Sequence, residues 1–181
     1  MDSVSQQLMK LYADYRRAPS IEEKTAFLSS QCMQICRPYP LYGARDRDTI
    51  VRYLQESAIA QSGIEVIDQA VRSSSEATKG YYTIRPLRAD ELEFGNDEEA
   101  KWAFASANEV YQKAKFEDWV GLRVDLWTET GMDLGTVHDG LMVKVKYWWR
   151  KEGEKWLQVM HHIIYLGVRD GTEGSEGEVL E

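Results

Sequence analysis

The sequence contains few of the residues that mark common functional sites. Two cysteines, Cys32 and Cys36, and three histidines occur in 181 residues. The C-x3-C spacing is not usual for zinc or for a thioredoxin-like redox pair. In an extended strand the two thiols would be over about 12 Å apart, too far for a disulfide. We therefore expect two reduced, structural thiols and no metal site.

The sequence patterns of many enzyme classes are also absent. There is no glycine-rich phosphate loop, no G-x-S-x-G elbow and no cluster of His, Asp and Glu with metal-ligand spacing. An enzyme built from this inventory would work without a cofactor. The longest apolar runs, such as HHIIYLGV, are much shorter than the ~20 residues of a membrane span. The N-terminus has no apolar stretch after a basic start, so we expect a cytoplasmic protein with no membrane partner.

The net charge of −8 is concentrated at one end of the chain. The segment DGTEGSEGEVLE carries five acidic residues and no basic one, which predicts a disordered, acidic tail over residues 170–181. The remainder, 1–169, is the length of one domain. No basic stripe with interleaved aromatic residues is present, so we expect no nucleic-acid partner.

The first half of the chain reads as helices around one short strand. Apolar residues at i, i+3, i+4 and i+7 predict a helix that Pro19 ends, and Ser20 with Glu23 has the pattern of a capping box for a second helix. CMQICRP reads as a strand and residues 46–60 as a third helix. IEVIDQAV, 64–71, has no clean period, YYTIRPL is a strand, and an apolar stripe predicts one helix over 97–117.

The second half predicts three consecutive strands in an antiparallel meander: WVGLRVDLWTE, LMVKVKYWWRK and WLQVMHHIIYLGVRD. Helices followed by a long curved sheet indicate an α+β, cone-shaped fold with the N-terminal helices covering the concave face. We expect the opposite face, with Lys144, Lys146 and Trp148, to be uncovered and to form a homodimer.

This order of elements resembles the SnoaL-like branch of the nuclear transport factor 2-like superfamily. The runs VYQKAKFEDWVGLRVDLW and MVKVKYWWRKEGEKWLQVMHHIIYLGVRDGTEG are similar to small fungal proteins of natural-product pathways, alkaloid or polyketide. The resemblance implies a cofactor-free cyclase or isomerase, including semipinacolase-like members. Those relatives carry a second Tyr where this chain has Ala107, a departure that bears on the specific rearrangement.

Arg37 is the first candidate for catalysis. In an extended strand it shares a face with Met33 and Ile35, and it would enter the pocket if that face were the inner one. A guanidinium there could hold a substrate oxygen, and the fungal relatives use an Arg at this strand end. The alternative is a surface Arg paired with a helix carboxylate.

Three further candidates lie on the predicted helix 97–117 and on the strand after it. Tyr111 is on the apolar stripe of its helix and carries a hydroxyl that could donate a proton or orient a substrate oxygen. The alternative is a buried tyrosine hydrogen-bonded to a main-chain carbonyl. Asp125 and Glu129 share one strand face with Trp127, and either carboxylate could act as the base if that face lined the pocket. A solvent-exposed face is the alternative.

His161 and His162 must point to opposite faces of their strand, and the register decides which one is inside. Pairing that places the Val143, Val145 and Tyr147 face inward favours His161 as the inner one. There it could be a general base, and the alternative is a core histidine hydrogen-bonded to a neighbour. The pocket walls are expected to be Tyr12, Met33, Trp127 and Tyr147.

Together these features predict a cofactor-independent isomerase or cyclase that acts on a hydrophobic metabolite by acid–base catalysis and conformational control. The alternative is a non-catalytic small-molecule-binding or dimerisation module of the same fold.

Overall fold

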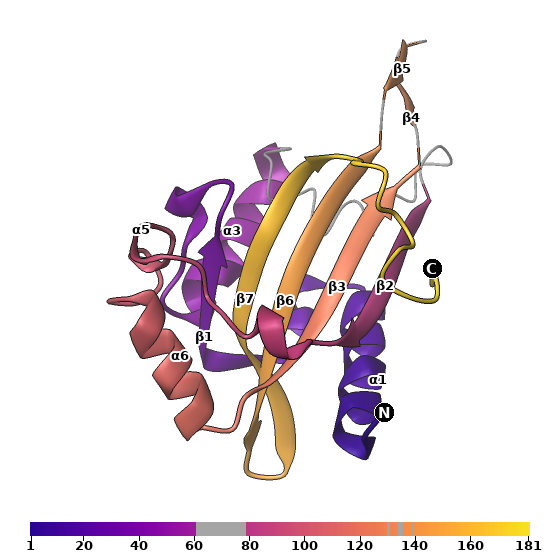
Figure 1. The fold of residues 1–181 in the computed structure, drawn as a ribbon. Helices are drawn as coiled ribbons and strands as arrows, with labels where there is room; N and C mark the ends of the chain where they lie inside the picture. Colours follow the sequence, from indigo (N-terminus) through magenta and orange to yellow (C-terminus); the bar gives the residue numbers. More distant parts are fainter. Residues whose placement is uncertain (61–78, 130, 134–135, 139) are drawn as a thin grey trace.

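A curved, unclosed sheet of five strands forms the centre of the molecule (Figure 1). The computed structural model describes residues 1–60, 79–129, 131–133, 136–138 and 140–181. The strand order is β1-β7-β6-β3-β2, with β1 parallel to β7 and the other pairs antiparallel. The strands are β1 Leu28–Cys36, β2 Gly80–Pro86, β3 Val120–Thr128, β6 Leu141–Glu152 and β7 Lys155–Val168. The predicted α+β architecture is confirmed.

The three C-terminal strands form the predicted meander. β6 and β7 are joined by a tight turn in which Gly153 has a φ of +61°, a left-handed conformation that favours glycine. The longer connection between β3 and β6 carries a small hairpin, β4 Gly131–Asp133 and β5 Thr136–His138.

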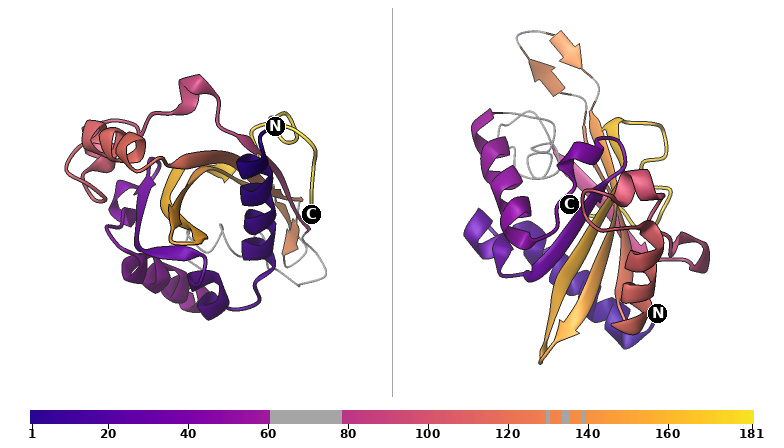
Figure 2. Two further views of the ribbon diagram at one scale, coloured as in Figure 1. Left: turned by 90° about the horizontal axis from the view of Figure 1, so that it is seen from below. Right: turned by 90° about the vertical axis from the view of Figure 1, so that its left-hand side faces the viewer.

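The N-terminal helices lie on the concave side of the sheet (Figure 2). Leu8, Tyr12 and Tyr15 are buried along α1, as its apolar stripe predicted, and the Ser20 hydroxyl accepts a hydrogen bond from the Glu23 backbone N–H at the start of α2. This second helix is short, because the chain turns into β1 at Leu28. The helices are α1 Ser3–Arg17, α2 Ile21–Thr25 and α3 Arg47–Ala60, with the short 3₁₀ turn η1 Pro40–Tyr42.

The helix predicted over 97–117 is wrong in one respect, since the structure divides it in two. α5 Asp97–Ala100 and α6 Ala107–Phe116 are separated by turns, and Ser106 caps α6 by accepting from the Glu109 backbone N–H at 3.2 Å. A 3₁₀ turn, η2 Ala89–Glu91, precedes them. The apolar residues have the predicted helical spacing, but Ser106 begins a new helix between them.

Two apolar clusters lie on the two faces of the sheet. The concave cluster joins α1 to inward residues of the strands, including Cys32, Cys36 and Ile163. The convex cluster joins α6 to Met33 and Trp148, among others. Figure 2 shows α3 on one side of the strands and α6 on the other. Each face of the sheet therefore has a helical cover.

The expectation that one face of the sheet is uncovered is therefore wrong. Lys146 and Trp148 are buried, and the Lys146 ammonium donates to the backbone carbonyls of Glu91 and Glu93 at 2.8 and 3.1 Å. The segment between β2 and β3 covers both side chains. The homodimer itself stays a prediction.

The C-terminal segment lies against the sheet instead of forming the expected disordered tail. Tyr82 and Leu180 exchange two backbone hydrogen bonds of 2.9 and 2.8 Å, and Glu176 pairs with Arg85 at 2.6 Å. In Figure 1 this segment runs beside β2. The boundary of the domain at residue 169 stays a prediction.

The structure agrees with the expectation that Cys32 and Cys36 are structural thiols. Both thiols are free and buried in the concave cluster, and burial raises the pKa of Cys36 to about 11. The ambiguous run 64–71 lies outside the described residues. Across the described parts of the chain, no helix has the length and apolar character to span a bilayer.

Candidate active site

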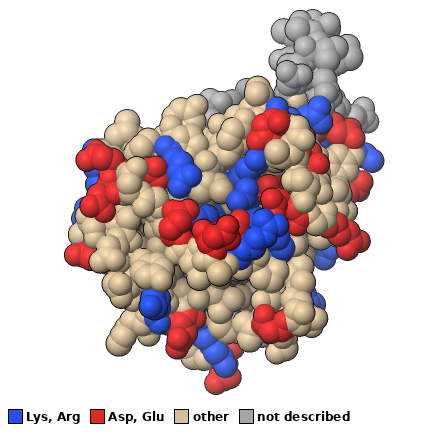
Figure 3. Space-filling view, in the orientation of Figure 1, with Lys and Arg blue, Asp and Glu red and all other residues tan. Residues whose placement is uncertain are grey.

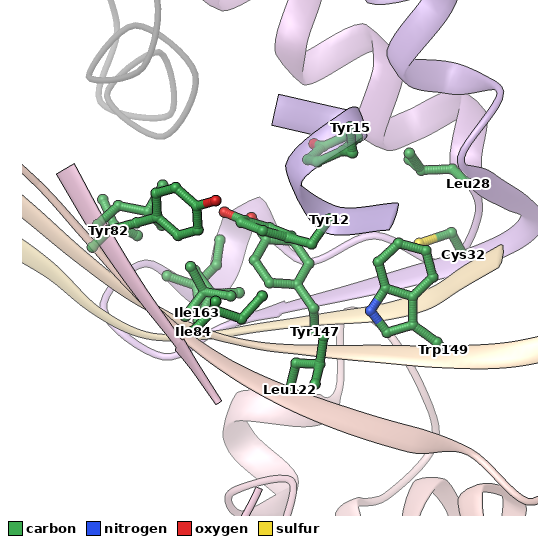
Figure 4. Packing of buried hydrophobic residues seen from close by; sticks show 14 of the residues in the cluster. Tyr12, Tyr15, Leu28, Cys32, Tyr82, Ile84, Leu122, Tyr147, Trp149 and Ile163 are labelled. Carbon is green, nitrogen blue, oxygen red and sulfur yellow. The ribbon is translucent and has the colours of Figure 1, made fainter. Parts of the chain in front are cut away.

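A group of polar aromatic side chains gathers on the concave face, between α1 and the strands. Tyr12 comes from α1, Tyr82 from β2 and Tyr147 from β6. All three are buried, and the ring centroids of Tyr12 lie 5.6 Å from Tyr82 and 5.0 Å from Tyr147. Figure 4 shows their hydroxyl ends turned toward one another. The interior of the sheet thus concentrates phenolic oxygens from three separate elements.

Arg16 extends this group along α1, one helical turn after Tyr12. Its guanidinium carbon lies 4.1 Å from the centroid of the Tyr82 ring, within the range of a cation–π contact. Burial raises the pKa of Tyr12 to about 12, while the nearby Arg16 and Tyr147 oppose that shift. Tyr12 is therefore a neutral hydrogen-bonding group near neutral pH.

His161 lies directly opposite Tyr147 in the β6–β7 ladder and faces the same interior. Its ring is 5.0 Å from the Tyr147 ring in an edge-to-face arrangement, and its Nε2 is 2.6 Å from Oε1 of Gln158. Burial lowers the pKa of His161 to about 4. With Gln158 as the acceptor, Nε2 carries the proton and Nδ1 is the basic nitrogen. The side chain is a neutral base at physiological pH.

A β-bulge places Gln158 beside His161. Trp148 pairs with Met160 but Trp149 pairs with Gln158, so Val159 is an extra residue in β7. Without this bulge, residues three apart on a strand would face opposite sides. The irregularity brings an amide acceptor to the histidine from its own strand.

A cavity of about 440 Å³ opens at the end of α1 next to this group. Its walls include Arg16, Arg17, Pro19, Tyr82 and Glu181. Arg16 and Tyr82 belong both to this cavity and to the buried aromatic group. Tyr82 is thus the tyrosine of that group that borders this cavity.

The expectation that Arg37 enters the interior is wrong. Its Nε is 3.1 Å from the Glu99 carboxylate, its Nη2 is 3.8 Å from Glu93, and its side chain is 40% exposed. Met33, on the same strand face, packs in the convex cluster. The alternation along β1 was predicted correctly, but that face is the outer one.

Asp125, Trp127 and Glu129 also lie on the outer side. Asp125 is buried and accepts from Arg123 Nε at 2.5 Å. Trp127 packs beside the ring of Tyr81 at 6.2 Å, and the exposed Glu129 accepts a 2.6 Å hydrogen bond from the Tyr81 hydroxyl. This face does not line the concave interior.

An ion-pair network surrounds Asp125. Arg85 pairs with Glu91 at 2.7 Å, and Arg123 lies 3.5 Å from the same carboxylate. Figure 3 shows acidic and basic side chains intermixed on this face. The Arg85 guanidinium lowers the pKa of Glu91 to about 2. These ion pairs attach η2 to the sheet. The carboxylates of Glu91 and Asp125 therefore have a structural role.

Tyr111 and His162 belong to the convex cluster or its edge. Tyr111 lines a second cavity of about 270 Å³ with Phe94 and Trp148, among others. The His162 ring stacks on Phe94 at 6.2 Å, and burial lowers its pKa to about 3. His161 is therefore the inner histidine, as the preferred register predicted.

Of the predicted site residues, the structure brings together Tyr12, Tyr147 and His161. Sequence reasoning missed Arg16, Tyr82 and Gln158. Two of them had a signal, because Arg16 is four residues after Tyr12 on one helix and Tyr82 alternates with the inward Ile84. Gln158 had none, since its position depends on the bulge.

The protein belongs to the SnoaL-like domain family, whose sequence profile matches residues 1–181. The curved mixed sheet with its helices has the nuclear transport factor 2-like fold of that family. No significant match was found among curated protein sequences.

Several solved structures are similar in architecture at low sequence identity. A nuclear transport factor 2-like protein of unknown function from Pseudomonas putida is 9% identical with a TM-score of 0.49, and the match covers 97% of this chain and 94% of that one. A ketosteroid isomerase-like protein from Erwinia carotovora is 13% identical with a TM-score of 0.40, covering 84% and 85%. The β subunit of benzoate 1,2-dioxygenase from Burkholderia mallei is 11% identical with a TM-score of 0.47, covering 90% and 89%. These similarities concern the fold alone.

Proposed function

We propose that this protein is a cofactor-independent isomerase or cyclase whose reaction takes place on the concave side of the sheet. The observation that carries the proposal is His161, a buried neutral base held by Gln158 and facing the same interior as the tyrosine hydroxyls. Membership of the SnoaL-like family supports an isomerase-type function. The substrate is a hydrophobic intermediate of natural-product metabolism.

The chemistry follows from a neutral base placed near phenolic donors. Nδ1 of His161 removes a proton from a carbon next to a carbonyl, the C–H electron pair forms a C=C bond, and the π pair of the carbonyl moves to its oxygen. A hydroxyl of Tyr12 or Tyr147 donates a hydrogen bond to the resulting enolate. Return of the proton to another carbon gives an isomer, and attack of the enolate carbon on an electrophile of the same substrate closes a ring. In a semipinacol-type 1,2-shift of an epoxy alcohol, His161 would remove the hydroxyl proton, and the carbinol C–O bond would become the carbonyl as one group migrates to the adjacent epoxide carbon. The C–O bond of the epoxide at that carbon breaks, and a tyrosine hydroxyl donates a proton to the released oxygen.

Confinement contributes to the same reaction. The aromatic walls provided by Tyr12, Tyr82 and Tyr147 would hold a flexible substrate in one conformation, which favours one product over several. Catalytic roles for Arg37, Tyr111, Asp125 and Glu129 stay predictions, and the proposed site does not use them.

The rival proposal is a non-catalytic small-molecule-binding or dimerisation module. It is favoured by the near-complete burial of His161 and Gln158, which would also suit a purely structural hydrogen bond. The two proposals differ in whether the protein moves a proton on a bound ligand.

Deuterium exchange separates them without knowledge of the product. The protein would be incubated with 2-tetralone in D₂O, and incorporation of deuterium next to the carbonyl would be followed by NMR. The catalytic proposal predicts exchange faster than in a buffer control and lost in His161→Gln. A wild-type rate equal to that of His161→Gln would favour the binding module.

A further inference from the structure

The cavity at the end of α1 contains two guanidinium groups without acidic partners. Within the described residues, no carboxylate lies within 4.0 Å of Arg16 or Arg17. Arg85, Arg123 and Arg150, in contrast, each pair with at least one carboxylate. Nη1 of Arg16 is buried and has no hydrogen-bond partner among the residues that the structure describes. A buried N–H of a charged group left without an acceptor costs free energy, so this position lacks a partner that a ligand could supply.

The helix end alone does not account for both residues. Basic side chains in the last turn of a helix interact favourably with its C-terminal carbonyls. The Arg16 guanidinium, however, lies over the Tyr82 ring at 4.1 Å and is therefore directed toward the sheet. Both Arg16 and Arg17 line the same 440 Å³ cavity.

One acidic residue also borders this cavity. Glu181 is part of its wall, and its carboxylate lies 3.9 Å from Nζ of Lys79. Its charge is thus shared with a lysine outside the cavity. The wall of this cavity therefore has two arginine side chains and one acidic side chain, and the acidic one is also paired with Lys79.

We propose that this cavity binds the carboxylate end of an aromatic molecule of about two rings. A guanidinium binds a planar carboxylate through paired hydrogen bonds, and the adjacent Tyr82 ring provides an apolar surface for the body of the ligand. The volume of about 440 Å³ is within the range of small-molecule sites. The inference deepens the proposed function, on which it rests for the identity of the ligand as substrate, by assigning that substrate an anionic end.

Binding of two isosteric probes tests the assignment. The dissociation constants of 2-naphthoate and of its uncharged analogue 2-naphthamide would be measured by calorimetry for the wild type, Arg16→Met, Arg17→Ala and Lys10→Ala. Met keeps the length of Arg16 over the Tyr82 ring but removes the charge. Lys10→Ala is the matched control, because it removes one exposed positive charge from the same helix away from the cavity.

We expect the wild type and Lys10→Ala to bind naphthoate at least about tenfold more tightly than naphthamide, the effect of a charge-assisted hydrogen bond. Each arginine variant should reduce this preference to less than about threefold. Because Arg17 is exposed, its variant should fold even if Arg16→Met does not. Equal affinities for the two probes, absence of naphthoate binding, or a preference retained in Arg17→Ala would overturn the proposal. His161→Gln should keep the naphthoate preference, so failure of the proposed catalysis and failure of this binding site are distinguishable.

Discussion

Tyr147 and His161 face each other across β6 and β7, with ring centroids 5.0 Å apart in an edge-to-face geometry. The pairing fixes which of two adjacent histidines enters the concave interior. Its consequence is chemical, because the inner histidine meets tyrosine rings and Gln158, whereas His162 meets Phe94 and Lys146 on the outer side. Two neighbouring residues of the same type therefore have separable roles.

Both histidines should make the fold sensitive to mild acid. Burial lowers the folded-state pKa of His161 to about 4, below its ordinary value of 6.5. As pH falls from about 6.5 toward 4, the unfolded chain takes up a proton that the folded chain does not, so stability falls with pH in this window. The acidic groups of the outer network titrate lower, with Glu91 at a pKa of about 2.

Urea unfolding at pH 7 and at pH 5 measures this effect. We expect the wild type to lose stability by about 1–3 kcal/mol between these values. Relative to the wild type, His161→Gln should lose less on acidification because glutamine does not titrate. An identical pH dependence in both proteins would contradict the burial of a neutral His161.

Removal of residues 172–181 should destabilise the protein. The deletion eliminates the pairing of Leu180 with Tyr82 and the ion pair between Glu176 and Arg85. We expect a loss of about 1–3 kcal/mol, seen as a melting temperature lower by several degrees.

Two point variants locate the cause of that loss. Glu176→Ala should reproduce part of it, since Glu176 contacts Arg85 and Arg88. Glu178→Ala removes an exposed charge from the same segment and should leave the melting temperature unchanged. If the deletion also melts at the wild-type temperature, the segment contributes nothing to the fold.

Glu129→Gln should be nearly silent in stability and in turnover. Glu129 is exposed on the outer face, where its contact is a hydrogen bond from the Tyr81 hydroxyl. That hydrogen bond raises the pKa of Tyr81 to about 12, so the variant should move the Tyr81 pKa back toward 10. Ultraviolet titration of the tyrosines detects the shift, and a large loss of activity in this variant would place the base on the outer face after all.

The sequence predicts the strands and most helices of this fold because their apolar periods are strong. It does not predict which face of β1 is the inner one. Met33 and Ile35 on one side and Cys32 and Cys36 on the other are all apolar, since α6 covers the outer face as the N-terminal helices cover the inner one. The incorrect prediction that Arg37 points into the interior followed from that ambiguity.

The C-terminal segment and Gln158 show a second limit of sequence patterns. Leu180 is held by backbone hydrogen bonds and Glu176 by ion pairs, and neither produces an apolar period. Gln158 reaches His161 through a bulge that shifts the register by one residue. Periodicity detects burial, whereas these contacts depend on register and on partners distant in the chain.

The most direct test of the account compares two single variants at adjacent positions, His161→Gln and His162→Gln. Each removes one buried imidazole, and the folded fraction of each would be checked by circular dichroism. Deuterium exchange into 2-tetralone would then be measured at pH 7. We expect His161→Gln to lower the exchange rate by about 10²–10⁴, as loss of a general base does, and folded His162→Gln to remain within about threefold of the wild type. Equal rates for wild type and His161→Gln, or a larger loss in His162→Gln, would contradict the assignment of His161 as the base.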